Sequence, residues 1–173
     1  AVDTAWLRMD RPDNLMMICG VLILRDRIAF ARFRAIVEER YLRYARFHQR
    51  PVEVKGLTFW ETDAAFDLDR HIERIKLPGK AGKNELQALV SRLVTQPLDP
   101  AHPLWQFHLV ENFTGGCALV ARIHHCYADG IALTQVLLSM TDPTRRRVAA
   151  KSTPAVKSAP ARRADDSTGL MQV

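Results

Sequence analysis

Residues 104–140 read LWQFHLVENFTGGCALVARIHHCYADGIALTQVLLSM, in which apolar runs alternate with short polar segments. The runs 104–110 and 117–123 have the length and composition of strands. The polar residues between them, which include two glycines, are typical of a hairpin turn. From Gly130 to Met140 the apolar residues recur at helical spacing. This stretch therefore predicts an antiparallel pair of strands that leads, through residues 124–130, into a helix.

The rest of the chain, read outward from this stretch, supplies further helices and strands. We expect the strand over residues 15–24 to be buried on both faces, because it is apolar throughout. The fold class is therefore α+β, a mixed sheet flanked by helices. The other elements expected are a helix over 3–9 with Asp3 as its N-cap, a helix over 29–44, strands over 52–60 and 71–77, and a helix that is capped by Asn84 and ends before Pro97.

The composition changes after Pro143. The chain has 173 residues, of which 47% are hydrophobic and 25% charged, values that are ordinary for a globular protein. A chain of this length supports one hydrophobic core, which we assign to residues 1–143. Residues 144–173 are rich in Ala, Pro, Ser, Arg and Lys and have few large apolar side chains. We expect them to form a flexible basic linker or tail.

The charge and the cysteines exclude several classes of protein. Residues 144–173 carry seven basic and two acidic side chains, so they account for +5 of the net charge of +6. The globular part is nearly neutral, which argues against a nucleic-acid-binding domain. The three cysteines form no pairing pattern, and no charged-then-apolar leader opens the chain. These features favour a reducing, cytoplasmic location, and the apolar runs are too short to span a bilayer.

The segment His124-His125-Cys126-Tyr127-Ala128-Asp129-Gly130 combines side chains that can carry chemistry. Adjacent strand residues point to opposite faces, so one histidine can face a cleft while the other faces the sheet. That geometry disfavours a shared metal, the spacing fits no standard zinc pattern, and we expect no metal. Asp129 can hydrogen-bond nearby main chain or an arginine, and Gly130 permits a tight turn.

Imidazole, with an ordinary pKa of about 6.5, suits general-base work near neutral pH. From composition alone, the alternative that both histidines are packed core residues has equal weight.

The segment HHxxxDG resembles the acyltransferase motif of the superfamily of chloramphenicol acetyltransferase, condensation domains and carnitine acyltransferases. Three further segments resemble the amino-terminal half of bacterial wax ester synthase/diacylglycerol acyltransferases. The resemblance covers most of residues 3–142 and implies one chloramphenicol-acetyltransferase-like lobe of a two-lobe enzyme. The three segments are residues 3–7, residues 11–17, and residues 97–100 together with Pro103-Leu104-Trp105.

This resemblance implies acyl transfer from acyl-CoA to a long-chain alcohol or diacylglycerol, which makes wax ester or triacylglycerol. In the superfamily the second histidine of the motif is the general base, here His125, and His124 orients the motif. Asp129 is structural and Gly130 leaves room near the reacting carbonyl. No covalent acyl-enzyme is required, so Cys126 is not expected to be a nucleophile. No cofactor is implied, since acyl-CoA is a substrate.

Other positions have two interpretations each. Pro103, Leu104 and Trp105 either position a strand and line the acyl route, or simply pack in the core. Arg50 lies in a stretch, 47–50, that resembles an arginine-bearing segment of the family. We expect Arg50 to pair with Asp129, because a buried carboxylate needs a partner. The alternative is a solvated arginine.

The chain departs from the family pattern because nothing in it resembles the carboxy-terminal lobe. That lobe, whether a separate chain, a cleaved fragment or a part outside this sequence, is expected to complete the acyl tunnel and the CoA site. One alternative function keeps the superfamily but uses another acceptor, as in condensation-type enzymes, and another is a non-catalytic lipid-binding or interaction lobe. Apolar substrates imply peripheral association with a membrane or lipid-droplet surface.

Overall fold

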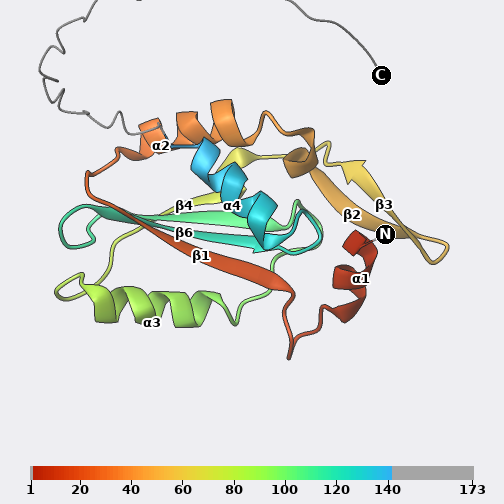
Figure 1. The fold of residues 1–173 in the computed structure, drawn as a ribbon, viewed down its shortest axis with the longest axis horizontal. Helices are drawn as coiled ribbons and strands as arrows, with labels where there is room; N and C mark the ends of the chain where they lie inside the picture. The colour runs from red at the N-terminus through yellow and green to blue at the C-terminus, as the bar shows by residue number, and fades with distance from the viewer. Residues whose placement is uncertain (1, 142–173) are drawn as a thin grey trace, which may run out of the picture. The chain divides into compact units, whose positions relative to one another are not determined.

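The computed structural model describes residues 2–141, and the linker or tail expected over 144–173 lies outside them (Figure 1). Short 3-10 helices occur at Ala45–His48 and Leu68–Arg70. The helix α2 continues into a π-helical turn at Val37–Tyr41. The main elements are α1 (Val2–Met9), β1 (Met17–Leu24), α2 (Phe30–Ile36), β2 (Gln49–Val54), β3 (Leu57–Thr62), β4 (Ile72–Ile75), α3 (Lys83–Leu93), β5 (Trp105–Val110), β6 (Cys117–His124) and α4 (Gly130–Ser139).

Four of the strands form one mixed sheet in the order β1-β6-β5-β4. The pairs β1–β6 and β5–β6 are antiparallel, whereas β4–β5 is parallel. β2 and β3 form a separate two-stranded hairpin. The expected α+β class, with a mixed sheet flanked by helices, is confirmed, as is the antiparallel pair over residues 104–124. In this register Met17 lies opposite His124, so the motif begins beside the start of β1.

Helices cover both faces of the sheet (Figure 1). α2 and α4 lie on one face, where Phe33 and Leu133 join a core that includes Phe107 and Leu119. α3 lies on the other face and packs its apolar residues against Val120 and its neighbours. Every residue of β6 is buried. Coverage on both faces explains why 117–123 is an almost continuous apolar run.

The expectation that β1 is buried on both faces is wrong. β1 lies at the edge of the sheet that the described residues form, where it pairs with β6 and with no second strand of residues 2–141. Val21 and Ile23, which point to the same face as the α3 core, are 42% and 64% exposed. α3 packs over β5 and β6 and does not extend across these two side chains. An apolar run therefore predicted the strand correctly but not its place in the sheet.

Residues 52–60 form a hairpin and not the single strand expected. The chain turns at Lys55 and Gly56, which have φ angles of 51° and 77°. Two consecutive residues with positive φ give the tight turn that joins adjacent antiparallel strands. Glycine adopts such angles without strain, so Gly56 is the sequence signal for this turn.

The capping predictions for two helices are also wrong. α1 begins at Val2, so Asp3 lies inside the helix. α3 begins at Lys83 with Gly82, not Asn84, at its N-cap. The Gly82 N–H donates to the Glu85 carboxylate at 2.9 Å. Glu85, at the N3 position, thus supplies the half of a capping box in which the N3 side chain accepts the N–H of the N-cap residue.

Candidate active site

The motif follows β6, and main-chain hydrogen bonds hold its two histidines. The His124 N–H donates to the Leu104 carbonyl at 3.0 Å, and the His125 N–H donates to the Met16 carbonyl at 2.9 Å. The main-chain N–H groups of the two histidines are therefore hydrogen-bonded in opposite directions of the sheet, one to the residue that precedes β5 and the other to the residue that precedes β1. The His124 side chain is 4% exposed, whereas His125 is half-buried. The two imidazoles thus lie in different environments, as expected for adjacent residues at a strand end.

His124 is a buried link within the motif. Its Nδ1 accepts a hydrogen bond from the Cys126 N–H at 3.1 Å, so the ring proton is assigned to Nε2. Nε2 lies 3.6 Å from the Asp10 carboxylate, too far for a hydrogen bond but close enough for electrostatic attraction. Burial lowers the pKa of His124, and the Asp10 charge opposes that shift. Asp10 also accepts the Met16 N–H at 2.7 Å, which orders the chain that enters β1.

His125 is positioned by stacking, and neither of its ring nitrogens has a hydrogen-bond partner among residues 2–141. Its ring lies 4.5 Å from the Trp6 ring, centroid to centroid, at an interplanar angle of 21°. Its Nδ1 is buried and has no hydrogen-bond partner among residues 2–141. No side chain or carbonyl within the same range hydrogen-bonds to Nε2. A half-buried imidazole of this kind can accept a proton from a substrate, provided that the substrate reaches hydrogen-bonding distance.

Asp129 and Gly130 begin α4. Asp129 Oδ1 accepts the Ala132 N–H at 2.8 Å, so Asp129 is the N-cap of the helix. The sequence left two partners open for Asp129, nearby main chain or an arginine, and the hydrogen bond to the Ala132 N–H is the first of these. Gly130 has no positive φ, so a strained turn does not require it. A Cβ at Gly130 would meet no atom within 4 Å, which leaves open space beside the motif.

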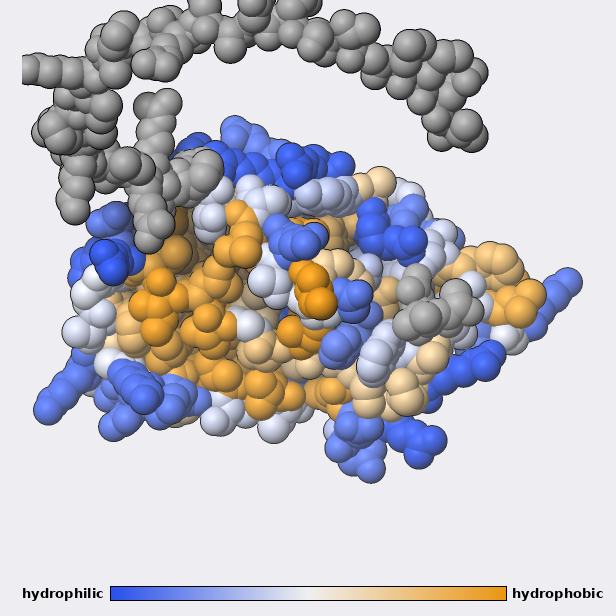
Figure 2. All heavy atoms as spheres, in the orientation of Figure 1, coloured by the Kyte–Doolittle hydropathy of each residue, from blue (hydrophilic) through white to orange (hydrophobic). Residues whose placement is uncertain are grey.

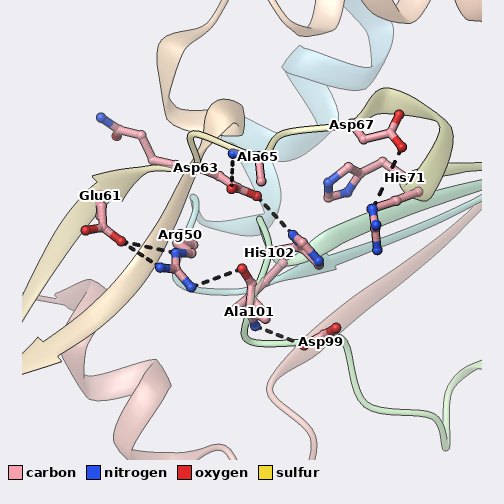
Figure 3. Close-up of polar contacts among 12 residues, drawn as sticks. Arg50, Glu61, Asp63, Ala65, Asp67, His71, Asp99, Ala101 and His102 are labelled. Atoms are coloured by element: carbon pink, nitrogen blue, oxygen red, sulfur yellow. Dashed lines mark hydrogen bonds and ion pairs between the residues drawn. The ribbon is translucent and has the colours of Figure 1, made fainter.

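The expected pair of Arg50 with Asp129 is wrong. Arg50 forms an ion pair with Glu61 at 2.8 Å and donates to the Ala101 carbonyl at 3.1 Å (Figure 3). The reason is the β2–β3 register, which places Arg50 directly opposite Glu61. Arg50 therefore joins the hairpin to the segment that precedes β5.

Pro103, Leu104 and Trp105 separate into different environments. Trp105 is fully buried, its Nε1–H donates to the Phe47 carbonyl at 2.9 Å, and its ring stacks on His71 at 4.3 Å. Pro103 and Trp105 both border a cavity of about 280 Å³. Leu104 borders a larger groove of about 590 Å³ between α1, the β2–β3 hairpin and residues 95–104. Asp10 also lines this groove, whereas His125 does not.

Sequence reasoning missed Tyr127, which anchors the motif loop. The Tyr127 hydroxyl donates to the Gln49 carbonyl at 2.6 Å and accepts the Leu104 N–H at 2.8 Å. Its ring stacks on Phe47 with centroids 5.6 Å apart. Burial raises the pKa of Tyr127, so the hydroxyl keeps its proton. The only sequence signal is a tyrosine inside an apolar strand-to-helix junction, where a buried hydroxyl needs partners.

Replacing Tyr127 with phenylalanine is expected to destabilise the protein by about 1–3 kcal/mol, because the Leu104 N–H is left buried without an acceptor. Urea unfolding monitored by circular dichroism measures the change. Tyr44→Phe is the matched control, since the Tyr44 hydroxyl accepts from Arg43 in an exposed contact. Equal losses in the two variants would contradict the anchoring role.

The buried histidines predict a stability that falls with acid. Burial lowers the pKa values of His71, His108 and His124 in the folded state. The unfolded chain therefore binds more protons below the ordinary histidine pKa, and the free energy of unfolding falls as pH decreases. The slope approaches about 1.4 kcal/mol per pH unit for each histidine. Unfolding between pH 7.5 and 5.5 measures this slope, which His108→Gln should reduce. A flat profile in the unchanged protein contradicts the prediction.

Other features of the described residues limit the chemistry. Cys19, Cys117 and Cys126 form no disulfide, and Cys126 is fully buried. Between residues 2 and 141, no three or more His, Cys, Asp or Glu side chains are grouped so as to hold a metal ion. The same part of the chain contains no helix with the length and apolar character needed to cross a bilayer.

Comparison with known sequences identifies relatives over most of the chain. The model of the wax ester synthase/diacylglycerol acyltransferase catalytic domain matches residues 1–172. The Mycobacterium tuberculosis protein named "Probable diacyglycerol O-acyltransferase tgs3" is 31% identical over 153 residues, which is 84% of this chain and 56% of that protein. A Mycobacterium bovis protein that carries a diacylglycerol O-acyltransferase name is 38% identical over 108 residues, 61% of this chain and 21% of its own length.

Solved structures show the same fold. The wax ester synthase/diacylglycerol acyltransferase of Marinobacter aquaeolei superposes with a TM-score of 0.65 at 23% identity, over 78% of this chain and 34% of that one. A starter condensation domain of rhizomide synthetase RzmA, in complex with C8-CoA, gives a TM-score of 0.68 at 17% identity, over 81% and 33% of the two chains. The chain thus spans about a third of these structures. From its domain match and its relatives, the chain belongs to the wax ester synthase/diacylglycerol acyltransferase family.

Proposed function

We propose that this chain is the motif-bearing lobe of an acyl-CoA-dependent O-acyltransferase in which His125 is the general base. The acceptor is a long-chain alcohol or diacylglycerol, and the product is a wax ester or triacylglycerol. One observation carries the proposal: His125 is half-buried, stacks on Trp6 and has no hydrogen bond to a described residue at either ring nitrogen, while His124 beside it is buried and its Nδ1 accepts the Cys126 N–H. Of the two histidines, only His125 is placed to exchange a proton with a substrate.

In the proposed reaction the acceptor oxygen attacks the thioester carbonyl of acyl-CoA directly. His125 takes the hydroxyl proton as the new C–O bond forms. The C–S bond then breaks, and the CoA thiolate leaves with the proton that His125 returns. Cys126 is fully buried, which supports transfer without an acyl-cysteine intermediate. No cofactor enters this scheme.

The proposed enzyme also needs a carboxy-terminal lobe. The chain covers 34% of the solved Marinobacter enzyme and 56% of tgs3. Ile131 and Leu138, on the outward side of α4 next to the motif, are 74% and 57% exposed. Exposed large apolar side chains on one side of a helix are typical of an interaction surface. We propose that a second lobe, in the same chain or a separate one, completes the acyl and CoA sites here.

A condensation-type transferase with a different acceptor is the second candidate. It is favoured by one observation, the fold likeness to the RzmA starter domain, whose structure contains C8-CoA. Both candidates use an acyl-CoA donor, so the acceptor distinguishes them. Because the leading candidate uses water-insoluble acceptors, we propose that it works at a membrane or lipid-droplet surface in the cytoplasm.

The test is an acceptor series assayed with the complete enzyme that contains this lobe. Palmitoyl-CoA is supplied with hexadecanol, dioleoylglycerol or an amino-acid thioester, and CoA release is followed with a thiol reagent. Turnover with the alcohol or the diacylglycerol supports the proposal. Turnover with the amino-acid thioester alone supports the condensation-type reaction. Binding of acyl-CoA without turnover on any acceptor indicates a non-catalytic lobe and overturns both.

A further inference from the structure

The β2–β3 hairpin carries an uncovered apolar face. In the hairpin register Val52 lies opposite Phe59 and Val54 lies opposite Leu57, so these four side chains share one face. Three of them are strongly exposed: Val54 is 52%, Leu57 63% and Phe59 49% exposed. Apolar residues are normally scattered singly over a protein surface, whereas these three are adjacent. We call Val54, Leu57 and Phe59 the hairpin face.

The hairpin is placed so that this face can meet a broad surface. Within residues 2–141, β2 and β3 pair with each other and with no strand of the four-stranded sheet. Figure 1 shows the turn at the far right of the folded part, beyond β1 and α1. Figure 2 shows a small group of apolar atoms at this end of the molecule, next to strongly hydrophilic ones, and a larger apolar area over the middle and left of the same face. A hairpin tip in this position can insert into a lipid layer while the four-stranded sheet stays in water.

The hairpin also borders the groove of about 590 Å³. Pro51 and Thr58, and Val52 from the side of the hairpin face, line it together with Leu7 and Leu98 from other segments. A volume of this size is typical of small-molecule sites, and its lining is largely apolar. Asp10, whose carboxylate faces His124, borders the same groove. The exposed hairpin face therefore lies next to a groove whose lining includes Asp10, the carboxylate that faces His124.

The charges near the tip suit a lipid surface. Lys55 occupies the turn itself, between Val54 and Leu57, and is exposed. Arg8 and Arg11, at the end of α1 and just beyond it, are exposed on the segment that forms another wall of the groove. Acidic side chains lie among these cations: Glu53 borders the groove, and Asp10 and Asp13 are exposed on the same segment as Arg8 and Arg11. Apolar side chains beside cations are the combination that inserts into a membrane interface and contacts lipid phosphates.

We propose that the hairpin face inserts into a lipid surface and holds the mouth of the groove against it. The occupant is the acyl-chain layer of a membrane or lipid droplet, and Lys55 contacts the phosphate level. This inference rests on the proposed function, because a lipid acceptor must leave such a surface to reach His125. It assigns a specific docking element to the lobe and names the groove as the path of the acceptor.

The experiment measures partitioning of the full 173-residue chain onto vesicles of pure phosphatidylcholine, with no acyl-CoA present. Zwitterionic vesicles are used because residues 144–173 carry basic side chains that all variants share. Leu57→Asp is expected to lower the partition coefficient about tenfold or more, since one inserted leucine is lost and a charge is added. Val54→Asp provides a second variant, and circular dichroism confirms that each is folded.

The matched control is Ile23→Asp on β1, where the isoleucine is 64% exposed, close to the 63% of Leu57. It replaces an exposed aliphatic side chain by aspartate outside the hairpin and should leave partitioning nearly unaltered. Equal losses for Leu57→Asp and Ile23→Asp would indicate that exposed apolar side chains bind the vesicles wherever they lie, and would overturn the proposal. Absence of vesicle binding by the unchanged chain also overturns it. So does a hairpin variant that changes only the oligomeric state, which would make a second copy of the chain the occupant. None of these results depends on turnover, so the proposed function is tested separately.

Discussion

His125→Ala is expected to lower the turnover number of acyl transfer by about 10²–10⁴-fold, the usual contribution of a positioned general base. The neutral hydroxyl of the acceptor is a weak nucleophile, and no other unoccupied base lies within the motif: His124 is buried and hydrogen-bonded, and Asp129 caps α4. Folding should be preserved, because His125 is half-buried and its anchoring bond to Met16 is made by the main chain.

The measurement is kcat for CoA release in the complete enzyme, with hexadecanol at saturation and the thermal unfolding midpoint recorded for each variant. Cys126→Ala is the matched control at the adjacent residue. It removes a buried thiol and should leave kcat close to that of the unchanged enzyme. A large loss in Cys126→Ala together with a small loss in His125→Ala would refute direct transfer and favour an acyl-cysteine.

A comparison with His124→Ala separates catalysis from positioning. His124 accepts the Cys126 N–H and faces the Asp10 carboxylate, so its removal takes away the acceptor of the Cys126 N–H and the imidazole that Asp10 attracts. We expect that variant to lose stability as well as activity. His125→Ala should lose activity alone. Comparing the loss of kcat with the loss of stability in each of the two variants therefore shows which histidine is the general base.

The sequence was sufficient for the features that depend on local pattern. The apolar runs before and after residues 111–116 predicted β5 and β6, and helical spacing predicted α4. The motif was correctly placed at their junction because a polar segment between a buried strand and a helix has few other positions. Burial on both faces makes β6 nearly all apolar, and that signal is readable in one sequence.

Features that depend on register or distant contacts could not be read in this way. The Arg50–Glu61 pair follows from the turn at Lys55–Gly56, and without that turn Arg50 was assigned to Asp129. Asp10 and His124 lie near opposite ends of the lobe in the sequence. No motif or spacing relates two residues so far apart, so their contact could not be predicted. β1 was misjudged because an apolar run looks the same in an edge strand and in a central strand.

Trp105→Ala is expected to destabilise the lobe by about 3–5 kcal/mol, which is the usual cost of deleting a buried aromatic side chain. Trp105 is fully buried, its ring packs against Tyr41 and Phe107 as well as His71, and its Nε1–H donates to the Phe47 carbonyl. Alanine would leave a large cavity and an unpaired carbonyl. Because small domains are stable by only about 5–15 kcal/mol, the loss is a substantial part of the total.

Urea unfolding of Trp105→Ala and Trp105→Phe, beside Phe59→Ala, distinguishes the two interpretations of this residue. Phenylalanine keeps most of the packing and loses only the bond to the Phe47 carbonyl, so its loss should be intermediate. Phe59 is exposed, and its removal should cost little. If Trp105 instead lined the acyl route, Trp105→Ala would keep the stability of the lobe and change the acyl chain length that the complete enzyme prefers. We expect the loss of stability, because the Trp105 ring stacks on His71, which comes from a distant segment of the core. The adjacent Leu104 carbonyl accepts the His124 N–H, so the position of Trp105 also fixes the strand that holds the motif.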